Sequence, residues 1–96
     1  MKYDLSKRVE DDIIRIAQKN NIEKVILFGS RARGDNGERS DVDLAVSGGN
    51  IIDFTYDIEE MAWTLLMFDV VDLDRNISGE LRQEIERDGV VLYEKV

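Results

Sequence analysis

Two aspartates, Asp41 and Asp43, follow the pair Gly29 and Ser30 after an interval of ten residues, and these four residues are the best suited to chemistry. Apolar residues alternate with the aspartates in the run 40–44, which predicts a strand whose two carboxylates project side by side. Such carboxylates repel each other by about 4 kcal/mol at 4 Å and an effective dielectric of about 20. A hard cation such as Mg²⁺ converts that repulsion into binding, so the pair predicts a metal site. Without the upstream pair, the same pattern is typical of a solvated strand edge.

The glycine–serine pair follows an apolar run, 23–28, that predicts a buried strand. Gly29 lacks a Cβ and allows a sharp turn, and Ser30 can begin a short helix whose free N–H groups suit an anion. Arg31 and Arg33 add positive charge that can fork onto phosphate oxygens. Alone, the pair is more often an ordinary strand-to-helix turn. Together with the aspartates it predicts nucleotidyl transfer, in which two Mg²⁺ ions activate the attacking oxygen and stabilise the leaving pyrophosphate.

Helices and strands that must position these residues alternate along the chain. The periodicity and capping signals predict helices over 6–19, 30–33, 52–66 and 79–87, and strands over 24–28, 41–46, 69–73 and 90–93. Ser78 is the expected N-cap of the last helix, and Gly89 its stop. The alternation predicts an α+β or α/β fold in which helices pack on a small mixed sheet, and residues 1–96 are expected to form a single domain.

The helix predicted over 52–66 is apolar on two sides. The side expected to face the core consists of Phe54, Ile58, Met61 and Leu65. The other side consists of Ile52, Tyr56 and Trp63. This second side either contacts a partner chain, including a second copy of this one, or is covered by another segment such as the C-terminal strand.

Composition excludes several classes of protein. The chain has no cysteine and no histidine, which removes disulfides, imidazole zinc sites and Ser-His-Asp hydrolysis. Its net charge of −8 argues against a broad surface for nucleic acid, although Arg31, Arg33 and Arg39 can form a small positive pocket. No apolar stretch is long enough to span a membrane, and no signal peptide is recognised, so we expect a cytoplasmic location.

The runs GSRARG (29–34) and SDVDL (40–44) resemble the signature of nucleotidyltransferases with the polymerase-beta-like fold, which is Gly-Ser, ten residues and Asp-x-Asp. The similarity is greatest to the minimal nucleotidyltransferase (MNT) group, found as antitoxins beside HEPN toxins. The tail LRQEIERDGVVLYE (81–94) also resembles that group. Because the resemblance covers essentially the whole chain, it implies the polymerase-beta-like nucleotidyltransferase fold throughout.

The resemblance also implies roles for individual residues. Gly29 and Ser30 would hold a triphosphate, and Asp41 and Asp43 two Mg²⁺ ions, while Arg31 or Arg33 would neutralise charge on the leaving pyrophosphate. The family carries a third carboxylate on a later strand. Asp69 and Asp72 are both available, and their spacing places them on opposite faces, so only one can join the pair. Asp69 fits the family pattern better, and Asp72 is expected at a strand end.

The implied reaction is transfer of a nucleoside monophosphate, AMP from ATP being favoured, onto a hydroxyl. The acceptor implied by the MNT group is a tyrosine of a HEPN toxin partner, so that the chain would be an antitoxin. Two alternatives stay open. One is a non-catalytic antitoxin that acts by binding alone. The other is transfer to a small molecule, for which a second subunit or partner would have to build the acceptor pocket.

Overall fold

The computed structural model describes residues 3–61 and 64–96, in which helices and strands alternate as predicted. The elements are α1 (Lys7–Lys19), β1 (Lys24–Phe28), α2 (Ser30–Arg33), β2 (Val42–Ser47), α3 (Ile51–Glu59), β3 (Phe68–Asp72), α4 (Gly79–Asp88) and β4 (Val90–Glu94). Ser6 and Ser78 cap α1 and α4 by accepting hydrogen bonds from amides three residues on. The predicted α+β class is confirmed.

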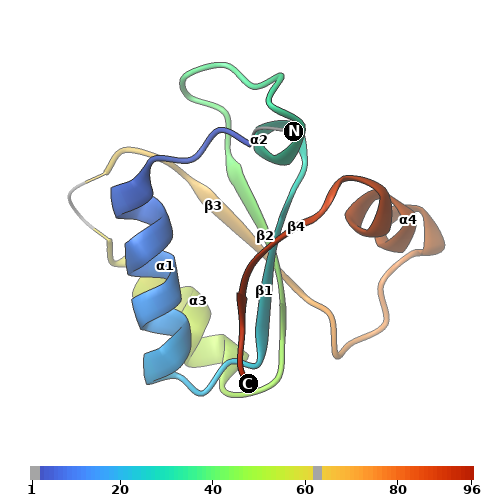
Figure 1. Cartoon of the computed structure of the whole chain (residues 1–96). Helices are drawn as coiled ribbons and strands as arrows, with labels where there is room; N and C mark the ends of the chain where they lie inside the picture. Colours follow the sequence, from blue (N-terminus) through green and yellow to red (C-terminus); the bar gives the residue numbers. More distant parts are fainter. Residues whose placement is uncertain (1–2, 62–63) are drawn as a thin grey trace.

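The described strands form one mixed sheet in the order β3-β2-β1-β4. β1 is antiparallel to β2 and to β4, whereas β2 and β3 are parallel. As a result, the end of β1 and the starts of β2 and β3 meet at one edge of the sheet. Figure 1 shows α1 and α3 on one face of the sheet and α4 on the other.

The main core lies between the sheet and the helices α1 and α3. It contains the predicted stripe of α1, the buried side chains of α3 and alternate residues of the central strands: Val9, Ile13, Ile16, Phe54, Ile58, Val25, Leu27, Val42, Leu44 and Val46. A smaller core under α4 contains Phe28, Ala45 and Ile85. Ala45 shares the face of the aspartates, as the alternation predicts, and is fully buried there. The α4 face of the sheet is therefore apolar in its middle.

The prediction that α3 extends to residue 66 was wrong, because the helix ends at Glu59. Leu65, expected in the core, is 97% exposed. The chain must leave the helix layer and enter the sheet at Phe68. A helix continued to Leu66 would leave two peptide steps, at most about 7 Å, to cross between layers that lie about 10 Å apart. Residues 64–67 instead have no regular secondary structure.

The second apolar side of α3 is uncovered by the described residues. Ile52 is 77% exposed and Tyr56 is 63% exposed, so the C-terminal strand does not cover them. Trp63, the third member of the predicted surface, lies outside the described residues. Of the two explanations that the sequence left open, internal coverage is excluded for Ile52 and Tyr56.

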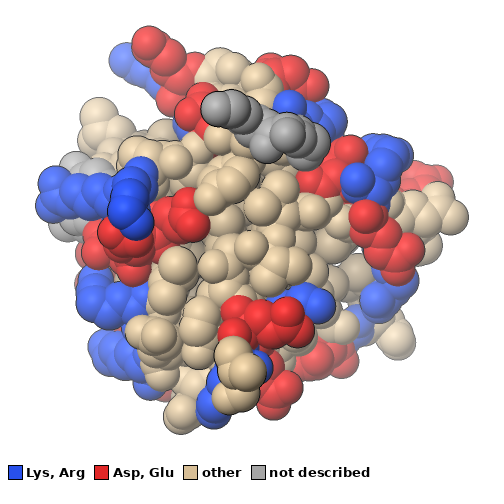
Figure 2. Space-filling view, viewed as in Figure 1, with Lys and Arg blue, Asp and Glu red and all other residues tan. Residues whose placement is uncertain are grey.

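Lysine and arginine are interspersed with aspartate and glutamate on the face shown in Figure 2, mostly around a central uncharged area. This face presents no broad basic tract of the kind that follows a nucleic-acid backbone. Among the described residues, no helix combines the length and the apolar character needed to cross a bilayer.

Candidate active site

Three aspartates lie together where β2 and β3 begin. Asp43 and Asp69 are direct partners in the parallel register of the two strands, so their side chains share a face. Asp41 precedes β2 by one residue and is exposed, as is Asp69, whereas Asp43 is half-buried. On its other side, Asp43 is the partner of Phe28, the last residue of β1. The glycine–serine turn therefore follows immediately beside the carboxylates.

The environment of Asp43 disfavours its charged form. Burial raises the pKa of Asp43 from 3.8 to about 6, and the negative charges of Asp69, Asp41 and Glu84 act in the same direction. The positive charge of Arg33 opposes them. A carboxyl that is half-buried among other carboxylates gains from a cation in place of a proton, because the cation relieves the same repulsion.

Gly29 brings the backbone against this carboxyl. Its φ of 78° lies in the region that favours glycine, and a Cβ at this position would overlap Asp43 Oδ2. Ser30 then begins α2. The amides of Ala32 and Arg33 donate to the Gly29 carbonyl at 3.1 and 3.2 Å, which closes the turn. The amides of Ser30 and Arg31 take no part in those two bonds.

Arg31 does not fit the predicted contact with phosphate. The residue is 5% exposed, and its guanidinium donates to the carbonyls of Ser40, Asp4 and Glu38 at 3.0, 3.1 and 3.0 Å. These bonds fasten the loop between α2 and β2 to the N-terminal segment. Arg31 therefore has a structural role, because it holds the loop that leads to Asp41 and Asp43.

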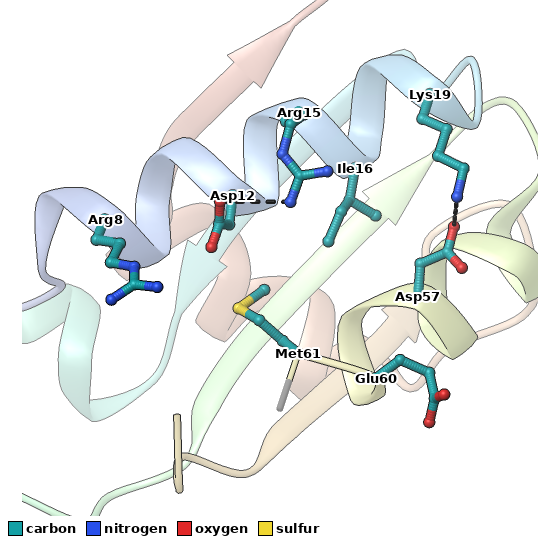
Figure 3. Close-up of a pocket in the computed structure, with 8 residues that line it drawn as sticks. All are labelled: Arg8, Asp12, Arg15, Ile16, Lys19, Asp57, Glu60 and Met61. Atoms are coloured by element: carbon teal, nitrogen blue, oxygen red, sulfur yellow. Dashed lines mark hydrogen bonds and ion pairs between the residues drawn. The ribbon is translucent and has the colours of Figure 1, made fainter. Parts of the chain in front are cut away.

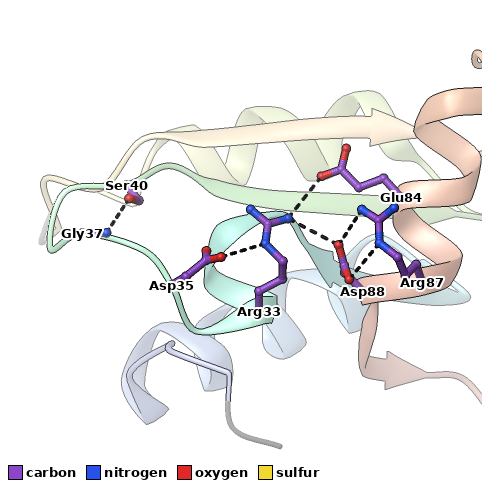
Figure 4. A network of polar contacts seen from close by, with 7 residues as sticks. All are labelled: Arg33, Asp35, Gly37, Ser40, Glu84, Arg87 and Asp88. Carbon is purple, nitrogen blue, oxygen red and sulfur yellow. Dashed lines mark hydrogen bonds and ion pairs between the residues drawn. The ribbon is translucent and has the colours of Figure 1, made fainter.

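Of the two arginines, Arg33 is the one whose side chain contacts carboxylates. Its guanidinium reaches from α2 to α4, as Figure 4 shows. Nε donates to Asp35 at 3.1 Å, and Nη1 lies 3.3 Å from Asp88 and 3.8 Å from Glu84. Sequence reasoning missed Glu84 and Asp88. The available signal was their spacing of four residues, which places both on one side of a helix once the predicted helix is extended by one residue to Asp88.

The donor set fits a hard divalent cation. Asp41, Asp43 and Asp69 supply carboxylate oxygens, the ligands that Mg²⁺ prefers, and their mutual repulsion adds to the effect of burial on the pKa of Asp43. Among residues 3–61 and 64–96, no three acidic side chains already surround a single point. Binding of a cation at this edge would therefore require the exposed Asp41 or Asp69 side chain to rotate.

Asp72, the alternative third carboxylate, lies at the opposite end of β3. It is the partner of Val46, accepts a hydrogen bond from the Asp74 amide at 2.8 Å and pairs with Arg75 at 3.4 Å. These contacts are those of a strand-end residue. The structure thus brings Asp69, and not Asp72, to the aspartate pair.

A groove of about 500 Å³ between α1 and α3 lies on the other face of the sheet and contains none of the predicted site residues. Lys19 of α1 pairs with Asp57 of α3 across the groove at 3.3 Å, and Arg15 pairs with Asp12 along α1 at 3.4 Å, as Figure 3 shows. Asp57 also accepts from Asn20 at 3.1 Å. The contacts of Asp57 tie α3 to the C-terminal end of α1.

Comparisons with known proteins agree with this geometry. The family model "Polymerase beta, Nucleotidyltransferase" matches residues 11–96. A relative from Methanocaldococcus jannaschii, provisionally named a protein adenylyltransferase, is 34% identical over 84 residues, which cover 78% of this chain and 82% of the relative.

Two solved structures are similar in fold and sequence. One is a toxin–antitoxin complex with AMP-PNP, with a TM-score of 0.69 and 29% identity over 90% of this chain and 73% of that chain. The other contains the tri-AMPylated HEPN toxin of Shewanella oneidensis in complex with an MNT antitoxin, with a TM-score of 0.65 and 25% identity over 95% of this chain and 74% of that chain. Because the family match extends from residue 11 to residue 96, the chain belongs to the polymerase beta nucleotidyltransferase family, as its two motifs predicted.

Proposed function

We propose that this protein transfers a nucleoside monophosphate, AMP from ATP in the first instance, onto a hydroxyl group in an Mg²⁺-dependent reaction. The observation that carries the proposal is the meeting of Asp41, Asp43 and Asp69 with the Gly29 turn at one sheet edge. The family assignment and the AMP-PNP complex of a structural relative support the choice of substrate.

Each residue of the site has a role in this proposal. Asp41 and Asp43 would hold Mg²⁺, which supplies Lewis-acid stabilisation of the phosphates when bound. Asp69, exposed beside Asp43, would complete the metal site and orient or deprotonate the acceptor hydroxyl. Ser30 would donate to the triphosphate, and the absence of a Cβ at Gly29 lets the phosphates approach the backbone. Arg33 would neutralise charge on the leaving pyrophosphate.

We further propose a tyrosine of a HEPN-type protein as the acceptor, with this chain acting as an antitoxin. Support comes from the two structural relatives, one of which contains a HEPN toxin modified with AMP. The exposed carboxylates suit such an acceptor, because a macromolecular side chain can reach an open edge without a pocket built by this chain.

Calorimetric titration of Mg–ATP tests the proposed site. The wild-type protein, alone or with its partner, should bind ATP only in the presence of Mg²⁺. The double variant Asp41→Asn, Asp43→Asn should lose that binding and stay folded, because both side chains keep their size. Metal-independent binding, or equal binding by the double variant, would contradict the site.

A binding-only antitoxin is the second candidate, since the structural relatives are held in complexes with their toxins. Neutralisation of the HEPN partner in cells separates the two functions. Asp43→Asn should fail to neutralise the partner if nucleotide transfer silences it. If that variant protects cells as well as the wild type does, binding alone is sufficient.

A further inference from the structure

Arg33 is held from two directions by elements far apart in the sequence. Asp35, in the loop after α2, accepts from Nε, and Asp88, at the end of α4, accepts from Nη1 at 3.3 Å (Figure 4). Glu84, one turn earlier on α4, lies at 3.8 Å. None of these contacts involves Nη2. The Nε–H and Nη1 point to opposite sides of the guanidinium, so these contacts hold it from both sides.

Asp88 is the more firmly placed of the two α4 carboxylates. Its side chain is 13% exposed, against 36% for Glu84. Asp88 also accepts from Arg87, with Oδ1 at 3.2 Å from Nε and Oδ2 at 3.0 Å from Nη2. The hydrogen bonds from Arg87 and from Arg33 hold the pKa of Asp88 below its ordinary value. Asp88 thus presents a fixed, ionised carboxylate to Arg33 at neutral pH.

The anchored guanidinium lies within electrostatic range of the catalytic edge. Arg33 belongs to α2, which begins directly after Gly29, and the backbone of Gly29 lies against the carboxyl of Asp43. A free arginine side chain loses up to about 2 kcal/mol of rotamer entropy when it is immobilised on a ligand. Holding Arg33 in place before the nucleotide arrives removes part of that cost.

We propose that Asp88 is a positioning residue that acts through Arg33, orienting the guanidinium toward the β- and γ-phosphates of the bound nucleotide. This inference rests on the proposed function and adds a residue that neither sequence motif contains. Because the β- and γ-phosphates leave as pyrophosphate, the effect of Asp88 is confined to nucleotides that carry them. AMP binding is independent of both Arg33 and Asp88.

A double-mutant cycle with Mg–ATP and Mg–AMP tests the proposal by calorimetry. Arg33→Gln should weaken Mg–ATP binding by about 10- to 100-fold, the usual range for loss of a charge-assisted hydrogen bond. Asp88→Asn should weaken it by about 3- to 10-fold when Arg33 is present and leave it unchanged in the Arg33→Gln background. Neither variant should change the affinity for Mg–AMP, and Asp88→Glu should recover part of the loss.

Arg87→Gln is the matched control, since it removes the other partner of Asp88 from the same helix and leaves Arg33 in place. It should weaken Mg–ATP binding less than Asp88→Asn does, because Asp88 keeps its contact with Arg33. Equal losses from Asp88→Asn with and without Arg33, or parallel losses for Mg–AMP, would show that Asp88 acts on the fold, and would overturn the positioning role. Normal Mg–ATP binding by Asp88→Asn would also overturn it and leave the proposed function intact. If the wild-type protein binds no Mg–ATP, both the positioning role of Asp88 and the proposed function are overturned.

Discussion

Asp43 destabilises the fold and also belongs to the proposed active site. It is half-buried beside two other aspartates and Glu84, and its raised pKa measures how poorly the metal-free protein accommodates its charge. An ionised carboxylate in such surroundings does not favour folding, so its presence there indicates a function. Asp43 therefore lowers the stability of the protein without a cation and, in the proposed function, would supply negative charge to Mg²⁺.

Asp43→Asn should stabilise the metal-free protein at neutral pH. The pKa of Asp43 is about 6 in the folded protein and 3.8 ordinarily, so between these values the folded state binds more protons than the unfolded state. The contribution of Asp43 to stability therefore falls as the pH rises from about 4 to 6, and the full penalty is present above 6. After allowance for solvent screening, we expect a gain of about 1 kcal/mol at pH 7.

Urea unfolding of the wild type and Asp43→Asn in EDTA, at pH 4 and at pH 7, measures this gain. The difference between the two proteins should be much smaller at pH 4, where Asp43 is protonated in the folded state and partly protonated in the unfolded state. A gain that is independent of pH would show that burial of the charge is not its cause.

Arg31→Lys should destabilise the fold by about 2 kcal/mol, because one ammonium group cannot serve the three backbone carbonyls that the guanidinium spans. Arg39→Lys, a change at an exposed arginine in the loop that Arg31 holds, is the control and should be neutral. Chemical denaturation of the two variants gives the comparison. Equal stability would mean that the contacts of Arg31 are replaced by water without loss.

The placement of Asp41 and Asp43 at the start of one strand, beside the Gly29 turn, was predictable from the sequence pattern itself. It was not predictable for Arg31 and Arg33, which are equivalent in a short polar motif. One turns inward to backbone carbonyls and the other outward to α4, and that difference depends on how the loop after α2 folds back. Asp88 escaped notice for the same reason, since its partner is 55 residues away in the sequence.

Elements with signals at both ends were predicted closely. The helix of residues 79–88 has a serine N-cap and is followed by Gly89. Glycine is needed there because a larger residue has no room, and not because of the backbone angle. Gly89 has a φ of −65°, which any residue can adopt, but a Cβ there would overlap the Ile85 carbonyl and lie 2.7 Å from Ile26 Cγ2. The end of α3 has no such signal. Its position is decided by the distance that the chain must cover to reach β3.

Gly89→Ala should therefore destabilise the protein by about 2 kcal/mol, as overpacking of a tight contact does. Gly79→Ala is the matched control, because a Cβ at Gly79, the first residue of the same helix, meets nothing within 4 Å. That variant should be neutral or slightly stabilising, since alanine favours helix. Thermal melts of the two variants decide the matter, and similar melting temperatures would exclude steric contact as the role of Gly89.

At the scale of the whole molecule, the two faces of the sheet contain different features. The α1–α3 face of the sheet contains the main core, and the α4 face contains the smaller core with the carboxylates at its edge. Exposed apolar side chains lie on α3, at Val91 and Val96, and on the irregular segment before β3, where Leu65 and Met67 are 97% and 68% exposed. Ile52 lies near Asp72, at the end of β3 opposite to Asp69, so an interface on α3 could hold a partner and leave the proposed catalytic edge open for an acceptor side chain.

Glutamate substitution on α3 tests whether this surface binds a partner. Ile52→Glu and Tyr56→Glu place a charge on side chains that are already exposed, so we expect unchanged folding and an affinity for the HEPN-type partner at least tenfold lower, as for loss of an apolar anchor worth 1.4 kcal/mol or more. Gln18→Glu, at an exposed position of α1, adds the same charge and should bind normally. Light scattering of the protein alone separates self-association from partner binding. Full affinity in both α3 variants would mean that the partner, if it binds, does so through another surface.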